Sequence, residues 1–175
     1  MDDAAQLESI SRAGETLADR LLAGGCVVSF GNGGSMSDAM HFAGELSGRF
    51  REDRRPLAAI AISDPAHLTA TANDYGYEWV FSRFIQGQVG HGDVVVAIST
   101  SGASPNVVRG AEAATERGAT VIALTGRAGS ALGAHADIEI CTPAGRYADR
   151  VQELHIKVLH ILVETVERRL ADAAG

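Results

Sequence analysis

Long apolar segments are missing from this sequence of 175 residues. No run approaches the ~20 apolar residues that a membrane helix needs, so a membrane-spanning segment is excluded. Basic residues are few as well: 15 Lys and Arg stand against 22 Asp and Glu, for a net charge of −7. This balance argues against a general nucleic-acid binder, although helix dipoles still let an acidic protein bind a small molecule that carries phosphate.

Cysteine is also rare, and the two that occur, Cys26 and Cys141, form no metal-spaced pair. Both lie in apolar stretches, which predicts buried free thiols. The N-terminal segment MDDAAQLES is acidic where a signal peptide would be basic and apolar, which predicts a cytoplasmic protein. The length and a hydrophobic content of 46% favour one globular domain over residues 1–175.

The sequence does contain a repeated alternation of short apolar segments and helical patterns. The predicted strands cover residues 26–30, 57–63, 93–99, 119–125 and 136–142. The predicted helices cover about 4–23, 36–46, 77–87, 107–118 and about 149–170. Such alternation is typical of a parallel sheet covered by helices on both faces, which is the doubly wound α/β class.

The last of these helices carries more apolar residues than one face of a sheet can cover. Between residues 156 and 163 they point nearly all round the helix. The excess predicts a second buried face, which a subunit interface supplies most simply. We therefore expect a homo-oligomer.

The loop GNGGS at 31–35 follows the first predicted strand, at the sheet edge where doubly wound folds bind ligands. Glycines let the backbone approach an anion, and the next helix offers free N–H groups. The loop is not a dinucleotide fingerprint, because Met36 stands where the third glycine would be, and the chain has no Walker motif. A tight turn without a ligand is the alternative.

The loop 99–106 follows the clearest strand and reads STSGASPN. Ser104 before Pro105 is typical of a helix N-cap, which accounts for one hydroxyl structurally. The three hydroxyls at 99–101 remain, and hydroxyls beside a helix N-terminus can hold a phosphate without Arg or Lys. The alternative is an ordinary polar turn.

Titratable groups gather on two of the predicted helices. His41 and Glu45 are four residues apart and share a face, and Asp38 lies on the same side. On the last helix, His160 stands among apolar residues, where a histidine satisfied within the core is the plainer interpretation. Spacing alone would pair His160 with Glu153, seven residues earlier.

Seven segments match one family in order along nearly the whole chain. They are GNGGS at 31–35, DAMHFAGEL at 38–46, RPLAAIAIS at 55–63, ANDYGY at 72–77, FSR at 81–83, GDVVVAISTSG at 92–102 and ADRVQELHIKVLHIL at 148–162. Together they resemble the sugar isomerase (SIS) domain family, and within it the sedoheptulose 7-phosphate isomerases. The resemblance implies a three-layer, flavodoxin-like, five-stranded sheet in a single SIS domain, and a homotetramer with active sites at subunit interfaces.

The resemblance also implies a role for particular residues. Glu45 and His160 would form the acid/base pair, in place of the pairing with Glu153. The sugar phosphate would contact Asn32, Gly33, Gly34, Ser35, Asn73, Asp74, Ser99, Thr100, Ser101, Ser104 and Gln152. Zinc, one ion per subunit, would be held by His41, Glu45, Gln152 and His160, and no nucleotide cofactor is implied.

The implied reaction is the aldose–ketose conversion of D-sedoheptulose 7-phosphate to D-glycero-D-manno-heptose 7-phosphate through an enediol. Such chemistry needs a base for the carbon-bound proton and a proton donor for the oxygens, which Glu45 and His160 can supply. One alternative is a non-catalytic SIS-domain regulator that binds a sugar phosphate or a protein. Another is an isomerase for a related sugar phosphate, such as an octulose phosphate, since Met36 departs from the family pattern near the implied sugar pocket.

Overall fold

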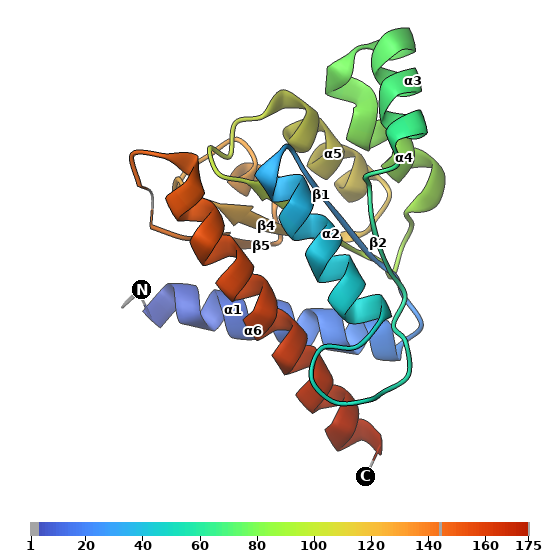
Figure 1. The fold of residues 1–175 in the computed structure, drawn as a ribbon, viewed down its shortest axis with the longest axis vertical. Helices are drawn as coiled ribbons and strands as arrows, with labels where there is room; N and C mark the ends of the chain where they lie inside the picture. The colour runs from blue at the N-terminus through green and yellow to red at the C-terminus, as the bar shows by residue number, and fades with distance from the viewer. Residues whose placement is uncertain (1–3, 144, 175) are drawn as a thin grey trace.

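The computed structural model describes residues 4–143 and 145–174. Five strands form one parallel sheet in the order β2-β1-β3-β4-β5 (Figure 1). Their bounds are β1 Val27–Gly31, β2 Ala59–Ala61, β3 Val94–Ser99, β4 Thr120–Thr125 and β5 Ile138–Cys141. The predicted five-stranded parallel sheet is confirmed.

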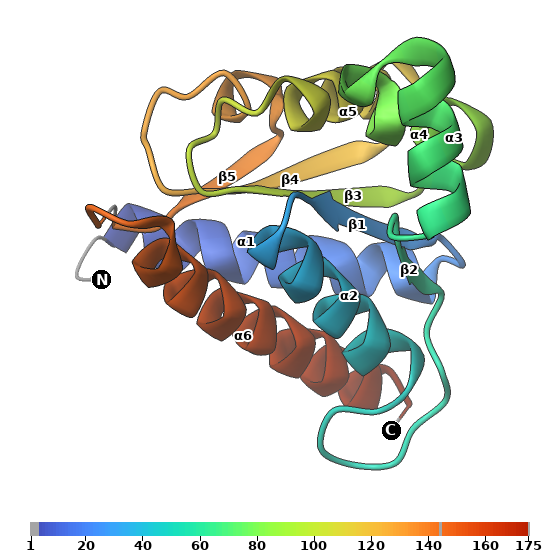
Figure 2. The same ribbon diagram turned by 45° about the horizontal axis from the view of Figure 1, so that its top comes forward.

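Helices lie on both sides of this sheet, as Figure 2 shows. On one side lie α1 Ala4–Leu22, α2 Gly34–Ser47 and α6 Ala148–Ala174. On the other lie α3 Pro65–Tyr75, α4 Val80–Gln88 and α5 Pro105–Glu116, with short 3-10 turns η1 Tyr77–Trp79 and η2 Gly133–His135. Alternate residues of β3 enter the two cores, Val94 and Val96 on the α1–α2–α6 side and Val95 and Ala97 on the other. The three-layer doubly wound architecture is therefore confirmed.

The strand order reverses between β1 and β3, which are neighbours in the sheet although β2 lies between them in the chain. Their register ends with Gly31 opposite Ile98, so the loops that follow the two strands leave the sheet side by side. Ligands of doubly wound folds bind at such a reversal, outside the carboxyl ends of the strands. The two loops singled out in the sequence, 31–35 and 99–106, are those that flank this point.

One helix was not predicted from the sequence. Residues 65–75 form α3, which begins after Asp64, whose carboxylate accepts a hydrogen bond from the His67 N–H at 2.7 Å. Thr71 is its one buried residue in the described chain, so α3 lacks the apolar stripe on which a periodicity argument depends. The predicted helix 77–87 is instead η1 followed by α4, and the predicted strand 57–63 is shortened to β2.

The broad apolar surface of α6 is covered mostly by this chain itself. Val158, Leu159, Leu162 and Val163 are at most 2% exposed and share one core with residues of α1 and α2. The second buried face is therefore supplied mostly by α1 and α2 of the same chain, and not by the subunit interface that was its simplest explanation from the sequence. Ile161 is the exception, because 47% of it is exposed.

Both cysteines are free, as expected, but they are half-buried rather than buried. Burial, together with the nearby Asp93 carboxylate, raises the pKa of the Cys26 thiol, which keeps it protonated. His155 is fully buried, with its Nε2 3.2 Å from the Thr125 carbonyl. Burial lowers the pKa of His155, so this side chain is a neutral part of the core. No helix within residues 4–143 and 145–174 is both long enough and apolar enough to cross a bilayer.

Candidate active site

The glycine loop turns directly from β1 into α2. A Cβ atom at Gly31 would stand 2.7 Å from the Ile98 carbonyl oxygen of the neighbouring strand, so this position requires glycine. Gly33 has φ 55 and stands at the N-cap of α2 without a side-chain capping bond. The N-terminus of α2, with its uncapped N–H groups and partial positive charge, therefore faces the reversal point.

The hydroxyl loop gathers its serines beside that helix end. The Ser99 Oγ lies 3.5 Å from the Ser101 Oγ and 3.3 Å from the Ser104 Oγ. Ser104 does occupy the N-cap position of α5, but in the described structure its hydroxyl makes no capping bond. The prediction that this hydroxyl is used by the helix is therefore wrong, and it turns toward Ser99 instead. The hydroxyl groups of Ser99, Ser101 and Ser104 therefore lie close together at the carboxyl end of β3.

An amide pair that the sequence analysis missed connects the two loops. The side-chain amides of Asn32 and Asn106 bond reciprocally, each Nδ2 donating to the other's Oδ1 at 2.9 and 2.8 Å. Asn106 is 3% exposed, and its Oδ1 also accepts the Val107 N–H at 3.0 Å. The Tyr77 hydroxyl donates to the Asn32 Oδ1 at 3.0 Å. Nothing in the sequence singled out Asn106, because its partner Asn32 is 74 residues away in the chain.

The helices α2 and α6 lie side by side and run in the same direction (Figure 2). Gly34 at the start of α2 packs against Gln152, and His41 farther along meets His160. The Nε2 atoms of His41 and His160 are 3.0 Å apart, and His41 Nε2 is 3.2 Å from the Glu45 Oε1. His41 therefore stands between the carboxylate and the second imidazole, and the three side chains form one polar cluster between two helices.

Two neighbours complete the surroundings of this cluster. The ring of Phe50 packs on His160 with centroids 5.4 Å apart. Asp38, one turn before His41 on α2, has a buried Oδ2 without a hydrogen-bond partner among the described residues. Burial raises the pKa of the Asp38 carboxyl, and the nearby His41 opposes that shift. Glu153 is not a neighbour of His160 in the described contacts; it binds Arg150 at 2.7 Å, so the pairing based on spacing is wrong.

The structure does not bring together all of the residues implied by resemblance. Gln152 lies against Gly34, eight residues before His160 and about 12 Å from it along the helix axis. Asn73 and Asp74 lie on α3, across the sheet, exposed and bonded to each other at 2.8 Å. Among the described residues, no three His, Cys, Asp or Glu side chains are arranged to hold a metal ion as they stand. The candidate site thus consists of the N-terminus of α2 and the hydroxyl loop at one end and a polar cluster between α2 and α6.

Comparison with known proteins identifies the class of this fold and site. The model of the family described as "SIS domain" matches residues 3–126. That match covers more than half of the chain, and the chain therefore belongs to the SIS domain family.

Its relatives within that family are phosphoheptose isomerases. The phosphoheptose isomerase of Klebsiella pneumoniae is 52% identical over 171 residues, covering 98% of this chain and 89% of that protein. The solved phosphoheptose isomerase of Neisseria gonorrhoeae has a TM-score of 0.85 and 40% identity, covering 92% of this chain and 86% of that one. That of Francisella tularensis has a TM-score of 0.87 and 34% identity with the same coverage. This chain is thus a member of the phosphoheptose isomerase group.

Proposed function

We propose that the protein interconverts D-sedoheptulose 7-phosphate and D-glycero-D-manno-heptose 7-phosphate, in line with its relatives, which are named phosphoheptose isomerases. The observation that carries the proposal is the cluster of Glu45, His41 and His160 between α6 and α2, the helix that begins at the reversal point of the sheet. The direct test is incubation with sedoheptulose 7-phosphate and, separately, an octulose 8-phosphate, followed by detection of the aldose. Aldose formed from the octulose phosphate alone would contradict the proposed substrate.

The reaction is an internal redox step in which two carbons exchange oxidation states. Glu45 removes a proton from carbon 1 of the ketose, and the electron pair of that C–H bond forms the enediol double bond. His160 protonates the carbonyl oxygen on carbon 2 and takes the proton from the hydroxyl on carbon 1. Return of the carbon-bound proton to carbon 2 completes the aldose, so no electron or atom is left over.

The remote end of the sugar is held by the two loops. Ser99, Thr100, Ser101 and Ser104 bind the phosphate, since three of their hydroxyls already converge in the free protein. Fixing that end makes the reacting carbons meet Glu45 in one geometry, which removes part of the entropic barrier. The remaining contacts to the substrate come from Asn32, Gly33, Gly34, Ser35, Asn73, Asp74 and Gln152.

Loss of a single hydroxyl from this loop is expected to weaken binding rather than chemistry. Ser101→Ala removes one hydrogen bond to a charged oxygen, which is worth ~1.5–3 kcal/mol, so KM should rise by roughly 10-fold or more. Ser11→Ala, at an exposed serine on α1, is the matched control and should leave KM unchanged. Unchanged kinetics for alanine variants at all four loop positions would place the phosphate elsewhere.

Zinc is the finer part of the proposal, with His41, Glu45, His160 and Gln152 as ligands. Two ligands of one tetrahedral zinc ion stand roughly 3.4 Å apart, and the two imidazole nitrogens are 3.0 Å apart. Gln152 lies about 12 Å from His160 along the same helix, so in this proposal it comes from a neighbouring subunit. A bound ion could polarise the substrate carbonyl. Metal analysis of the purified protein tests this: one zinc per subunit is expected, and His41→Ala should lose it.

A homotetramer with active sites at subunit interfaces is also proposed. Ile161 and Met40 are 47% and 50% exposed immediately beside His160 and His41, and large apolar side chains are costly to leave in water. Asn73 and Asp74 lie across the sheet from the cluster of their own chain, which suits a contribution to a neighbouring subunit's site.

Two substitutions on α6 separate assembly from folding. Ile161→Glu places a charge at an exposed apolar position and should give dissociated but folded subunits by light scattering and circular dichroism. Leu159→Glu buries the same charge at a position that is 0% exposed and should unfold the chain. A mass of 18.2 kDa for the unmodified protein at micromolar concentration would contradict the oligomer.

We place the protein in the cytoplasm and treat residues 1–175 as one SIS domain. A sugar phosphate is charged and does not cross a bilayer unaided, so its enzyme belongs on the side where the substrate is made. The two unpaired cysteines suit a reducing compartment. The packing of α1 on α6 joins the two ends of the chain in one core.

A further inference from the structure

Arg54, in the segment between α2 and β2, binds the end of the helix that carries Glu45. Its Nη2 donates to the Glu45 carbonyl oxygen at 2.6 Å, and its Nη1 donates to the Leu46 and Gly48 carbonyls at 2.9 and 3.2 Å. The last carbonyls of a helix lack partners within the helix and attract positive charge. The guanidinium group therefore satisfies the last carbonyls of α2, including that of Glu45, the residue proposed as the base.

The same guanidinium is joined to α6, the helix that carries His160. Its Nε donates to the Glu167 Oε1 at 2.8 Å, in an ion pair whose side chains are 12% and 15% exposed. Glu167 lies seven residues after His160, on the same face and about 10.5 Å farther along the helix. It also accepts the N–H of Phe50, whose ring packs on His160. One buried cation therefore connects the two helices just beyond the polar cluster.

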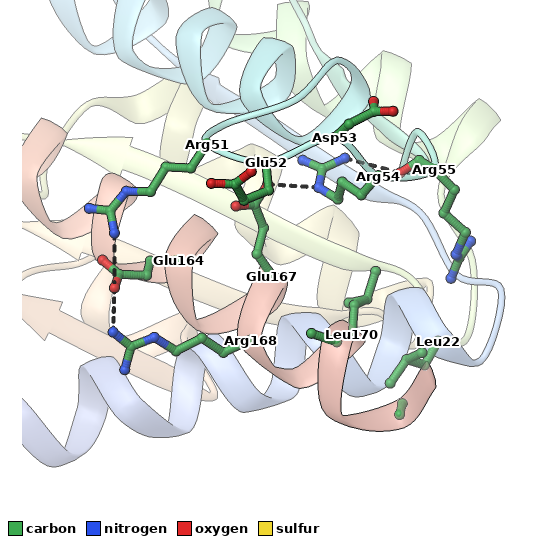
Figure 3. Close-up of a pocket in the computed structure, with 12 residues that line it drawn as sticks. Leu22, Arg51, Glu52, Asp53, Arg54, Arg55, Glu164, Glu167, Arg168 and Leu170 are labelled. Atoms are coloured by element: carbon green, nitrogen blue, oxygen red, sulfur yellow. Dashed lines mark hydrogen bonds and ion pairs between the residues drawn. The ribbon is translucent and has the colours of Figure 1, made fainter. Parts of the chain in front are cut away.

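Arg54 lies outside the region proposed to bind substrate. A cavity of about 830 Å³ opens beside it, and the residues of its wall come from the segment 51–55 and the ends of α1 and α6 (Figure 3). Among the described residues that line this cavity, none belongs to the set proposed to contact sugar or phosphate. Within one chain, Arg54 therefore acts on the reaction through the positions of other groups.

From these contacts, and resting on the proposed roles of Glu45 and His160, we propose that Arg54 is a positioning residue for proton transfer. The base and the proton shuttle lie on different helices and meet across His41, so their separation depends on how α2 and α6 are held together. Arg54 fixes the backbone of one and a side chain of the other with a rigid, planar fork. Lysine, a single point charge, cannot reproduce those directions.

The test measures kcat and KM for Arg54→Ala, Arg54→Lys and the control Arg55→Ala. Arg55 is the adjacent arginine, exposed to solvent, and Figure 3 shows its side chain directed away from Glu167. A displacement of about 1 Å at the reacting groups can cost 10²-fold in rate, so kcat should fall by roughly 10–100-fold in both Arg54 variants. KM should change little, because the phosphate is held by another part of the chain. Arg55→Ala should match the unmodified protein.

Chemical rescue separates positioning from simple stabilisation. Guanidinium ion at tens of millimolar, far below the molar concentrations that unfold proteins, should restore part of the kcat of Arg54→Ala by filling the vacated space. It should not restore Arg54→Lys, in which the lysine occupies that space. If Arg54→Ala does not fold, Arg54→Lys and Glu167→Gln, each verified as folded by circular dichroism, give the kcat comparison instead.

The outcomes distinguish this inference from the function on which it rests. Folded Arg54 variants with normal kcat, alongside an inactive Glu45→Gln, would overturn the positioning role alone. A Glu45→Gln enzyme with normal turnover would overturn the proposed roles of the acid/base pair first. A lowered kcat without rescue, together with a fall in thermal stability that accounts for it, would reduce Arg54 to a structural ion pair and contradict the proposal.

Discussion

Glu45→Gln is expected to lower turnover by roughly 10²–10⁴ while the sugar phosphate still binds. Glutamine keeps the shape of the side chain and its place on α2 but cannot accept the proton from carbon 1. The carboxylate is 25% exposed and lies 3.2 Å from the His41 imidazole, so it is open to substrate yet held in place. Because the phosphate loop is untouched by the change, KM should stay close to its original value.

Glu153→Gln is the matched control for this substitution. Glu153 is the carboxylate that spacing alone would have paired with His160, yet it is bound to Arg150 on the surface, with 58% of its side chain exposed. Its replacement should leave turnover unchanged, since an exposed ion pair of this kind contributes little. Near-normal turnover of Glu45→Gln would contradict the assignment of Glu45 as the base.

Deuterated water gives an independent measure of the same step. A proton held on a solvent-accessible carboxylate can exchange before it returns to carbon, so deuterium should appear at carbon 2 of the aldose. Complete absence of solvent deuterium would point to a shielded proton transfer or a hydride shift. In that case the turnover of Glu45→Gln decides between the two, because a hydride shift does not need the carboxylate as base.

His160→Gln is expected to be the second most damaging change, with turnover lowered by roughly 10²-fold or more. His160 is half-buried between His41 and the ring of Phe50, which leaves its imidazole one orientation in which to move protons on the substrate oxygens. Glutamine fills much of the same space and can still form hydrogen bonds, but it does not titrate. The loss should fall on kcat rather than on KM, because the hydroxyl loop proposed to hold the phosphate is unchanged.

His91→Gln is the control, because His91 is exposed on the turn before β3, at the opposite end of that strand from the hydroxyl loop. It should leave both kcat and KM unchanged. If His160→Gln lost only a modest part of its kcat, the proton shuttle would have to be another group. His41, 3.0 Å away, would then be the first to examine by the same substitution.

Much of the fold followed from local pattern. Strands such as β3 are continuous runs of β-branched residues between loops, and such runs are typical of a sheet buried on both faces. Helix α3 could not be predicted from apolar periodicity, because it is specified by a capping aspartate and a proline rather than by an apolar stripe. The apolar residues of α6 led to the opposite error. They suggested a subunit interface, although α1 and α2 of the same chain cover most of that surface.

Some residues of the candidate site could likewise be predicted from the sequence, and others could not. The glycine and hydroxyl loops could be selected from sequence because each is a short, continuous segment placed directly after a strand. Asn106 could not, because its importance depends on an amide 74 residues away in the chain. The Ser104 hydroxyl was assigned to the helix cap by local rules, and only its distance to Ser99 shows that it turns to the neighbouring serines.

The sequence by itself determined the five parallel strands, the two loops at the reversal point and the residue types able to hold phosphate and move protons. These depend on periodicity and on contacts between near neighbours in the chain. Only the tertiary structure decided that His160 meets His41, which is 119 residues away, and not Glu153 on its own helix. Only it showed Arg54 between α2 and α6, because contacts between distant segments are set by how whole helices pack and not by any local pattern.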